Sequence, residues 1–127
     1  MKKNAITSSI EDYLEVIYEC LKQNQKVKAV EISKKLGVSR ASVTEALQKL
    51  AQKGYIRYEK NKPIELTEIG LKIAEAVALR HSVLCEFFNK ILGLDLVEAE
   101  ENACKVEHVI SQNAFEKLIE FINIHNK

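Results

Sequence analysis

The chain has 127 residues, of which 46% are hydrophobic, with one proline and four glycines, a composition typical of one globular, helix-rich domain or two small ones. The formal net charge is only +1, but residues 1–65 hold 13 Lys and Arg against 8 Asp and Glu, whereas residues 66–127 hold 6 against 10. A basic first half suits a polyanion, and an acidic second half suits cations.

Composition also disfavours secreted and membrane proteins. Met1 to Asn4 lead into no apolar run, so we expect no signal peptide, and no apolar stretch approaches membrane-span length. Cys20, Cys85 and Cys104 lack CxxC spacing and are odd in number, which argues against a disulfide framework. We therefore expect a cytoplasmic protein, with Cys20 in the core of the fold.

The first predicted helix opens at Ser8-Ser9-Ile10-Glu11, which is a capping-box pattern, and an apolar stripe continues it to about Lys22. Its other side is acidic. Asp12 and Glu15, at i and i+3, can reach a single ion, although a solvated acidic face is the simpler interpretation of that side.

The next elements predict a winged helix-turn-helix domain. A short helix closed by Gly37 is followed by a turn and a longer helix from about Arg40 to Lys53. Two strand-like segments, 55–58 and 64–66, are joined by a charged turn and form the predicted wing. The first domain is thus expected to cover residues 1–66.

The outer face of the longer helix is polar, and lysines follow on the wing. Ser, Thr, Gln and Arg side chains can reach phosphates and base edges in a major groove, and wing lysines can meet the DNA backbone. An ordinary solvated helix face is the alternative. The negative charge of Glu45 is also unfavourable near phosphate. We predict contacts with double-stranded DNA from Ser39, Arg40, Ser42, Thr44, Gln48, Lys49, Lys60 and Lys62.

The second domain, residues 67–127, is predicted to begin with a long connecting helix, capped by Thr67 and running from Glu68 to about Leu92. His81 and Cys85 lie on this helix at i and i+4, a usual spacing for a pair of metal ligands. A lone His and a lone Cys are more often structural, so this pair alone is weak.

Two further helices follow, one capped by Asp95 with Glu98 and one starting near Ser111. Both are apolar along more than one edge, which in so small a chain indicates a subunit interface. We therefore expect a homodimer.

The first of these two helices carries potential metal ligands along one face. Glu100, Cys104, Glu107 and His108 would share one helical face, and a thiol, an imidazole and two carboxylates are ligands for divalent transition metals. A helix that needed only a core would place Leu, Ile or Val there. The alternative is that Cys104 is a small buried hydrophobe beside solvated charges.

The order of these parts resembles the diphtheria toxin repressor family of metal-dependent repressors, with its iron-dependent and manganese-dependent branches. The resemblance covers about residues 8–124 and is carried by Glu11-Asp12-Tyr13-Leu14-Glu15, the winged helix, Leu66-Thr67-x-x-Gly70, Arg80-His81 and Ala103-Cys104-Lys105-Val106-Glu107-His108. It implies a DNA-binding domain, a helical dimerisation domain and two metal positions per subunit. The carboxy-terminal SH3-like domain of many members is not expected here.

The resemblance also implies a ligand set. Cys104, Glu107 and His108 match the main ligands, and Asp12 matches the ligand from the first helix, where the iron branch usually has Met and the manganese branch Asp. The manganese branch usually has Glu at the position of Cys104, so the chain mixes the two patterns. The remaining matches are His81 in the second site, Cys85 where the family usually has Glu, Glu100 where the iron branch has His, and Glu15 as a manganese-branch ligand.

The expected function is a repressor that binds a palindromic operator as a dimer and controls metal-uptake genes. One Cys among carboxylates and His makes Fe(II) the first choice of ion, followed by Mn(II) and Zn(II). Two competing hypotheses remain: a winged-helix regulator that answers to an organic ligand or thiol oxidation, and a metalloenzyme. The enzyme is disfavoured because the sequence indicates no nucleophile or substrate pocket.

Overall fold

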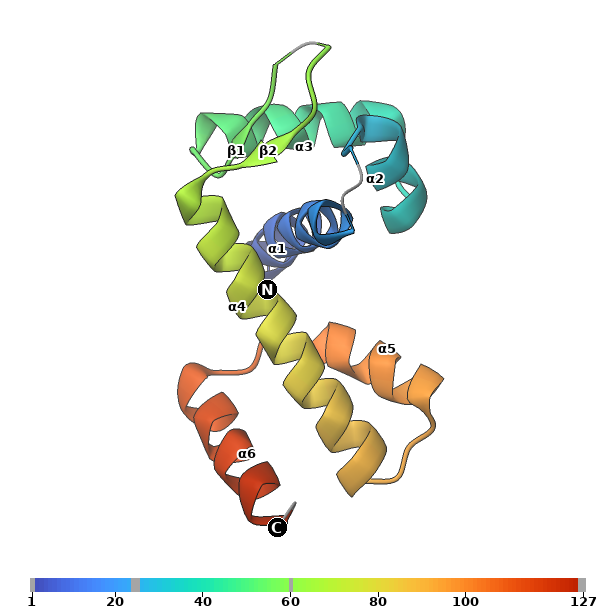
Figure 1. Ribbon diagram of the computed structural model, residues 1–127, viewed down its shortest axis with the longest axis vertical. Coiled ribbons are helices and arrows are strands. Elements are labelled where there is room, and N and C mark those ends of the chain that lie inside the picture. Colours follow the sequence, from blue (N-terminus) through green and yellow to red (C-terminus); the bar gives the residue numbers. More distant parts are fainter. Residues whose placement is uncertain (1, 24–25, 60, 126–127) are drawn as a thin grey trace. The chain divides into compact units, whose positions relative to one another are not determined.

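The computed structural model describes residues 2–23, 26–59 and 61–125, with side chains from Ile10 onward. The fold is mainly helical, as expected, and divides into two compact units, Met1–Glu75 and Ala76–Lys127. Helix α4 (Glu68–Glu86) contributes residues to both units (Figure 1). Within the described ranges, no helix combines the length and apolar character needed to cross a membrane.

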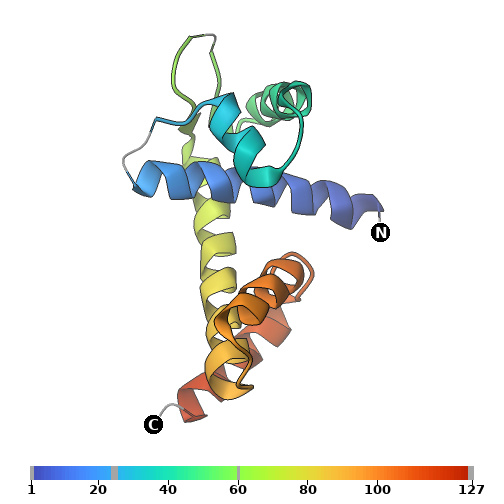
Figure 2. The ribbon, with the colours of Figure 1, turned by 90° about the vertical axis from the view of Figure 1, so that its right-hand side faces the viewer.

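The first unit is built from three helices and a small hairpin. Helix α2 (Ala29–Leu36) packs against both α1 (Lys2–Lys22) and α3 (Arg40–Gln52), and the three surround one apolar core (Figures 1 and 2). Cys20 is buried in this core, which confirms its predicted place. The fully buried side chains include Leu14, Ile17, Ile32, Val43 and Leu47.

The predicted helix-turn-helix and wing are both present. Gly37 ends α2 in the left-handed conformation, with φ at 67°, and its N–H donates to the Ser33 carbonyl at 2.9 Å. Strands β1 (Ile56–Arg57) and β2 (Glu65–Leu66) pair antiparallel, and their hairpin projects from the unit (Figure 2). The second strand is shorter than predicted because the Ile64 N–H donates to the Val27 carbonyl at 3.3 Å rather than across the hairpin.

The first helix begins earlier than the sequence predicted. Helix α1 starts at Lys2, so Ser8-Ser9-Ile10-Glu11 lies within the helix and the prediction of a helix start there was wrong. Residues 2–7 contain no glycine or proline, and lysine and alanine have high helix propensity, so nothing local stops the helix upstream of Ser8.

The start of α4 is hydrogen-bonded to, and packs closely against, the end of the helix-turn-helix. Thr67 caps it as predicted, because its Oγ1 accepts from the Gly70 N–H at 3.2 Å and donates to the Gly54 carbonyl at 2.6 Å. A Cβ at position 70 would overlap the backbone oxygen of Tyr55. Only glycine therefore allows this approach, which explains Gly70 in physical terms.

The second unit places two helices around the carboxyl end of α4. This helix does not stay α-helical to Leu92, as predicted, but ends at Glu86 and continues as a π-helical turn, η1 (Phe87–Ile91), closed by the bond from the Leu92 N–H to the Phe87 carbonyl at 3.0 Å. Helices α5 (Leu96–Val106) and α6 (Gln112–His125) flank this segment on opposite sides (Figures 1 and 2).

Local capping again follows the sequence. The Asp95 carboxylate accepts from the Glu98 N–H at 2.9 Å at the start of α5, and the Ser111 hydroxyl accepts from the Ala114 N–H at 3.1 Å at the start of α6. The core cluster of this unit is small, since it contains Leu84, Cys85, Ala99 and Ala103. The two short alanine side chains let α5 lie close to α4.

Candidate metal centre

Two helices of the second unit carry most of the candidate metal ligands. Helix α4 carries His81 and Cys85 one turn apart, and α5 carries Glu100 and Cys104 one turn apart. The α-helix ends at Val106, so the prediction that Glu107 and His108 share it was wrong. Glu107 keeps helical backbone angles and its N–H still donates to the Ala103 carbonyl at 2.9 Å, which is why its side chain continues on the same side.

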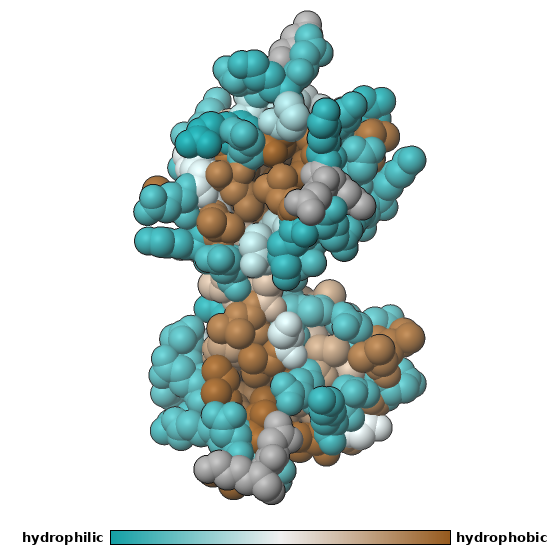
Figure 3. All heavy atoms as spheres, viewed as in Figure 1, coloured by the Kyte–Doolittle hydropathy of each residue, from teal (hydrophilic) through white to brown (hydrophobic). Residues whose placement is uncertain are grey.

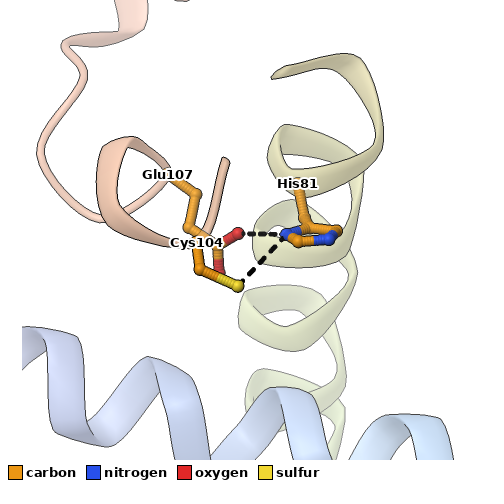
Figure 4. Close-up of side chains that lie close together, drawn as sticks. All are labelled: His81, Cys104 and Glu107. Atoms are coloured by element: carbon orange, nitrogen blue, oxygen red, sulfur yellow. Dashed lines mark hydrogen bonds and ion pairs between the residues drawn. The ribbon is translucent and has the colours of Figure 1, made fainter. Parts of the chain in front are cut away.

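His81 lies at the centre of this group, with a partner at each ring nitrogen. Its Nδ1 is 2.7 Å from Glu107 Oε1 and 3.8 Å from Cys104 Sγ, as Figure 4 shows. Its Nε2 is 2.6 Å from Glu100 Oε2. One imidazole thus connects residues that the sequence had assigned to two separate sites.

Glu107 is the one buried charged residue of the described part of the chain. Its Oε1 contacts His81, but its Oε2 is buried and accepts no hydrogen bond, and His108 Nε2 stands 3.4 Å away. A buried carboxylate oxygen without a hydrogen bond is unfavourable unless a positive charge compensates it.

The two carboxylates shape the electrostatics of the group. The hydrogen bond to Glu107 is the main cause that raises the pKa of His81 to about 9, and Glu100 adds to the rise against the opposing effect of burial. The pKa of Glu100 is lowered, chiefly by its hydrogen bond to His81. Burial raises the pKa of the Cys85 thiol, with Glu100 adding to the effect. Without a metal ion, His81 is therefore the cation between two carboxylates.

The donor atoms of His81, Cys104 and Glu107 fit a divalent transition metal. These atoms lie within 4.8 Å of one another. Ligands that bind one zinc ion at about 2.0–2.3 Å lie at most about 4.6 Å apart, so small side-chain rotations suffice. An imidazole, a thiol and a carboxylate are also the donor types that such ions take. The orphaned Glu107 oxygen gives the ion an unsatisfied partner.

The remaining predicted ligands divide between the two units. Cys85 lies next to Glu100, with Sγ 3.3 Å from Oε1, and His108 lies next to Glu107. Asp12 and Glu15 are half-buried on α1 in the first unit. Their part in an ion site stays a prediction.

Sequence reasoning assigned no role of its own to Arg80. Its guanidinium donates to the Glu107 carbonyl and to the Gln112 side chain, both at 3.5 Å, and so contacts the turn that presents Glu107. The position of Arg80 directly before His81 was the one sequence feature that could have indicated a role. The segment that Arg80 contacts could not be predicted without the fold.

The predicted DNA-contacting residues occupy one end and the outer side of α3, and the wing. Ser39 caps α3: its Oγ accepts from the Ser42 N–H at 3.1 Å and donates to Ser42 Oγ at 2.9 Å. Thr44 is half-buried, and Lys60 lies outside the described residues. The exposed members are Ser39, Arg40, Ser42, Gln48, Lys49 and Lys62, with Lys49 3.7 Å from Glu45 and Lys62 3.1 Å from Glu59.

Comparison with known proteins assigns both parts of the chain to one family. Residues 5–64 match the family model of the iron-dependent repressor N-terminal DNA-binding domain, and residues 67–126 match that of the iron-dependent repressor metal-binding and dimerisation domain. Together these matches cover nearly the whole chain.

Comparison with individual proteins supports the same family. The chain is 40% identical to an uncharacterised helix-turn-helix transcriptional regulator of Methanocaldococcus jannaschii, over 89% of this chain and 91% of that protein. It is 33% identical to the transcriptional regulator MntR of Oceanobacillus iheyensis, over 92% of this chain and 79% of that protein. A solved manganese-dependent transcriptional repressor in complex with manganese matches with a TM-score of 0.84 and 27% identity, over 90% of this chain and 52% of that one. The chain thus spans about half the length of that structure.

The sequence resemblance is therefore confirmed over both units, and the second of them brings a thiol, an imidazole and a buried carboxylate together. The matched domains are those of a transcriptional regulator and not of an enzyme. The chain belongs to the iron-dependent repressor family, the DtxR and MntR family of metal-dependent transcriptional repressors.

Proposed function

We propose that this chain binds operator DNA as a homodimer when Fe(II) occupies the second unit, and that it thereby represses metal-uptake genes. The observation that carries the proposal is the convergence of His81, Cys104 and Glu107 around a buried carboxylate oxygen that accepts no hydrogen bond. A divalent ion bound there would give this oxygen the direct partner that no hydrogen bond provides.

The choice of ion depends on the thiol. Carboxylates and imidazole alone suit Mn(II), whereas a thiolate shifts preference toward Fe(II) or Zn(II). One matched solved structure is a manganese-dependent repressor in complex with manganese, so Mn(II) is the nearest rival of Fe(II). Replacing Cys104 by Glu is expected to move the preference toward Mn(II).

For the main ion we propose the sequence-derived ligands Asp12, Cys104, Glu107 and His108, with Glu15 as a weaker candidate, and we add His81 because its Nδ1 lies beside Cys104 and Glu107. The contribution of Asp12 rests on the sequence resemblance. Counting bound ions in Asp12→Ala tests it, since loss of a ligand weakens binding without unfolding α1. A second ion at His81, Cys85 and Glu100 is the further sequence prediction, and the same count in the unsubstituted chain tests it.

The exposed surface of the second unit supports the dimer. Large apolar side chains reach solvent there, and Figure 3 shows them as brown areas on this unit. Contiguous exposed apolar surface marks an interaction site. The residues are Leu79, Leu92, Leu96, Val97, Val109, Phe121 and Ile124.

In the mechanism, the paired subunits set the spacing of their two α3 helices. Operator half-sites on one face of DNA are about 34 Å apart, so only a dimer with the matching separation reads both. Without an ion, no metal neutralises the negative charges of Asp12, Glu100 and Glu107. The chain can then populate other arrangements. Ligation by Glu107 and its neighbours favours the DNA-binding arrangement by as much as the ion prefers that arrangement.

The decisive experiment is anaerobic fluorescence anisotropy with the DNA upstream of this protein's own gene. Fe(II), Mn(II) and Zn(II) are titrated separately, each followed by a chelator. We expect tight binding with Fe(II) that the chelator reverses. Glu107→Gln should abolish the response, whereas Glu101→Gln, an exposed neighbour on α5, should retain it. Tight binding that ignores the chelator would contradict the proposal.

One observation favours a second candidate, a winged-helix regulator that answers to an organic ligand. A pocket of about 460 Å³ lies between α1 and α3 in the first unit. Its described lining is mainly apolar, with Lys53 and Glu45 among the charged residues beside it. This candidate predicts DNA binding that is independent of metal and that a small apolar compound alters.

A further inference from the structure

We infer that Glu45 selects a cytosine in each half-site of the operator, by accepting a hydrogen bond from the amino group that this base presents in the major groove. Glu45 acts here on the operator DNA of the proposed function, on which the inference rests. A carboxylate is thereby added to a contact surface that was otherwise assigned to neutral and basic side chains.

Glu45 lies at the centre of the outer face of α3. It is two residues from each of the buried side chains Val43 and Leu47, which belong to the apolar core. Two residues correspond to about 200° around an α-helix, so Glu45 points almost directly away from that core. Its side chain is 74% exposed. The buried residues fix the rotation of α3 about its own axis, and that rotation directs Glu45 outward.

Glu45 also lies in the part of α3 that is expected to meet the bases. The amino-terminal residues of a recognition helix are those that contact base edges. Helix α3 runs from Arg40 to Gln52 and is capped by Ser39, which places Glu45 in its amino-terminal half. Ser42, one turn earlier, is exposed on the same side of the helix. Both side chains can therefore enter a groove together.

A carboxylate is unfavourable near DNA phosphates, and Lys49 offsets this effect. Its Nζ stands 3.7 Å from Glu45 Oε1, one helical turn further along α3. The two side chains together carry no net charge, so they repel the phosphate backbone less than a lone carboxylate would. Stabilisation of the helix by this exposed ion pair is the competing explanation of Glu45, and it predicts no dependence on the identity of a base.

The edges of the bases make the contact selective. A carboxylate only accepts hydrogen bonds, and the major-groove edge of cytosine presents a donor, the N4 amino group. Guanine presents the acceptors N7 and O6, and thymine presents O4 and a methyl group, so neither offers a donor. Adenine has a donor at N6, but its N7 acceptor lies beside it. Cytosine is therefore the base that suits Glu45 best.

The test selects binding sites from a pool of random DNA duplexes, using the full chain with Fe(II) and in parallel with Mn(II). Sequencing of the bound DNA should give a palindromic motif with a cytosine at one position of each half-site. Replacing that cytosine by thymine should weaken binding about 5- to 150-fold, which is the effect of one lost base contact.

Two substitutions assign the preference to Glu45. In Glu45→Ala the four bases should bind about equally at that position, while binding to unrelated DNA becomes tighter because a negative charge is lost. In Glu45→Gln the preference should move from cytosine to adenine, because a glutamine amide pairs with adenine N6 and N7. Both variants change an exposed side chain, and circular dichroism checks that each one folds.

Glu68→Ala is the matched control. Glu68 forms a similar exposed pair with Lys72 on α4, at 3.9 Å, so this variant removes the same charge and the same kind of ion pair away from α3. It should select the same motif as the unsubstituted chain.

A cytosine preference that persists in Glu45→Ala would overturn the inference. So would a motif that is identical in Glu45→Gln and in the unsubstituted chain, which is the result that helix stabilisation alone predicts. A motif selected equally well in chelator would contradict the proposed function and leave the assignment of Glu45 to the variants. The absence of any motif would overturn both.

Discussion

The two units use their interiors differently. The first buries a continuous set of large apolar side chains, among them Leu14, Ile17, Ile32 and Leu47. The second buries a small cluster around Leu84 and two alanines, and it adds the buried carboxylate of Glu107. It also buries Val77, Phe115 and Ile122, but several of its large apolar residues lie on the surface, where Val97 and Ile124 are 71% and 69% exposed.

This contrast indicates a division of labour. Apolar burial stabilises a unit by itself, at about 25 cal/mol per Å² removed from water, whereas a buried charge lowers stability until it is compensated. The first unit is therefore expected to be stable without ligands. The second is expected to depend on an ion for its interior and on a partner for its surface.

The largest expected effect comes from the core of the first unit. Leu47→Ala removes a fully buried side chain and should lower the free energy of unfolding by about 2–5 kcal/mol. Ile124→Ala, on the exposed side of α6, should change it by less than about 0.5 kcal/mol. Urea titrations followed by circular dichroism measure both. Equal effects would show that burial of Leu47 in the first unit and exposure of Ile124 in the second do not distinguish the two positions.

Next in size is the effect of an ion on the second unit. At a free Fe(II) concentration of 100 times its Kd, stability should rise by about 2.7 kcal/mol. Amide hydrogen exchange should slow in α5 and change little in α2. In Glu107→Gln the added ion should have little effect, because the buried carboxylate is lost. Protection that appears in α2 alone would place the ion elsewhere.

Gly70→Ala tests how tightly the first unit is packed. The added methyl group meets the Tyr55 carbonyl, and overpacking of this kind lowers stability by about 1–3 kcal/mol. Glu75→Ala, an exposed change further along α4, is the control. Thermal unfolding measures the difference, and a Gly70→Ala chain as stable as the control would show that this contact yields without penalty.

The smallest expected effect is a pH dependence of the metal-free second unit. The pKa of folded His81 is about 9, above its ordinary value of 6.5. Its ion pairs therefore contribute fully below about pH 6.5, and the contribution fades as pH rises through 9. Urea titrations in chelator at pH 6 and pH 9.5 should show this loss, and His81→Gln should abolish it. A stability that increases over this range would contradict the assignment.

Local features of the fold were predictable from local residues. Gly37 ends α2 because glycine tolerates a positive φ, and Thr67 and Asp95 cap their helices because a side-chain oxygen two or three residues ahead of a free N–H can accept from it. The ends of long helices were less predictable. The amino-terminal extension of α1 and the π-helical turn after Glu86 have no strong local signal.

The sequence by itself determined which side chains carry the chemistry: spacing alone grouped Glu100 with Cys104 on one helix and His81 with Cys85 on another. Only the tertiary structure decided which of them meet. His81 lies 23 residues from Cys104 and 26 from Glu107 along the chain, yet its Nδ1 contacts both, while its Nε2 contacts Glu100. Helical periodicity fixes neighbours within one helix, but the pairing of two helices depends on packing, here on small residues such as Ala99 and Ala103 that let α5 approach α4.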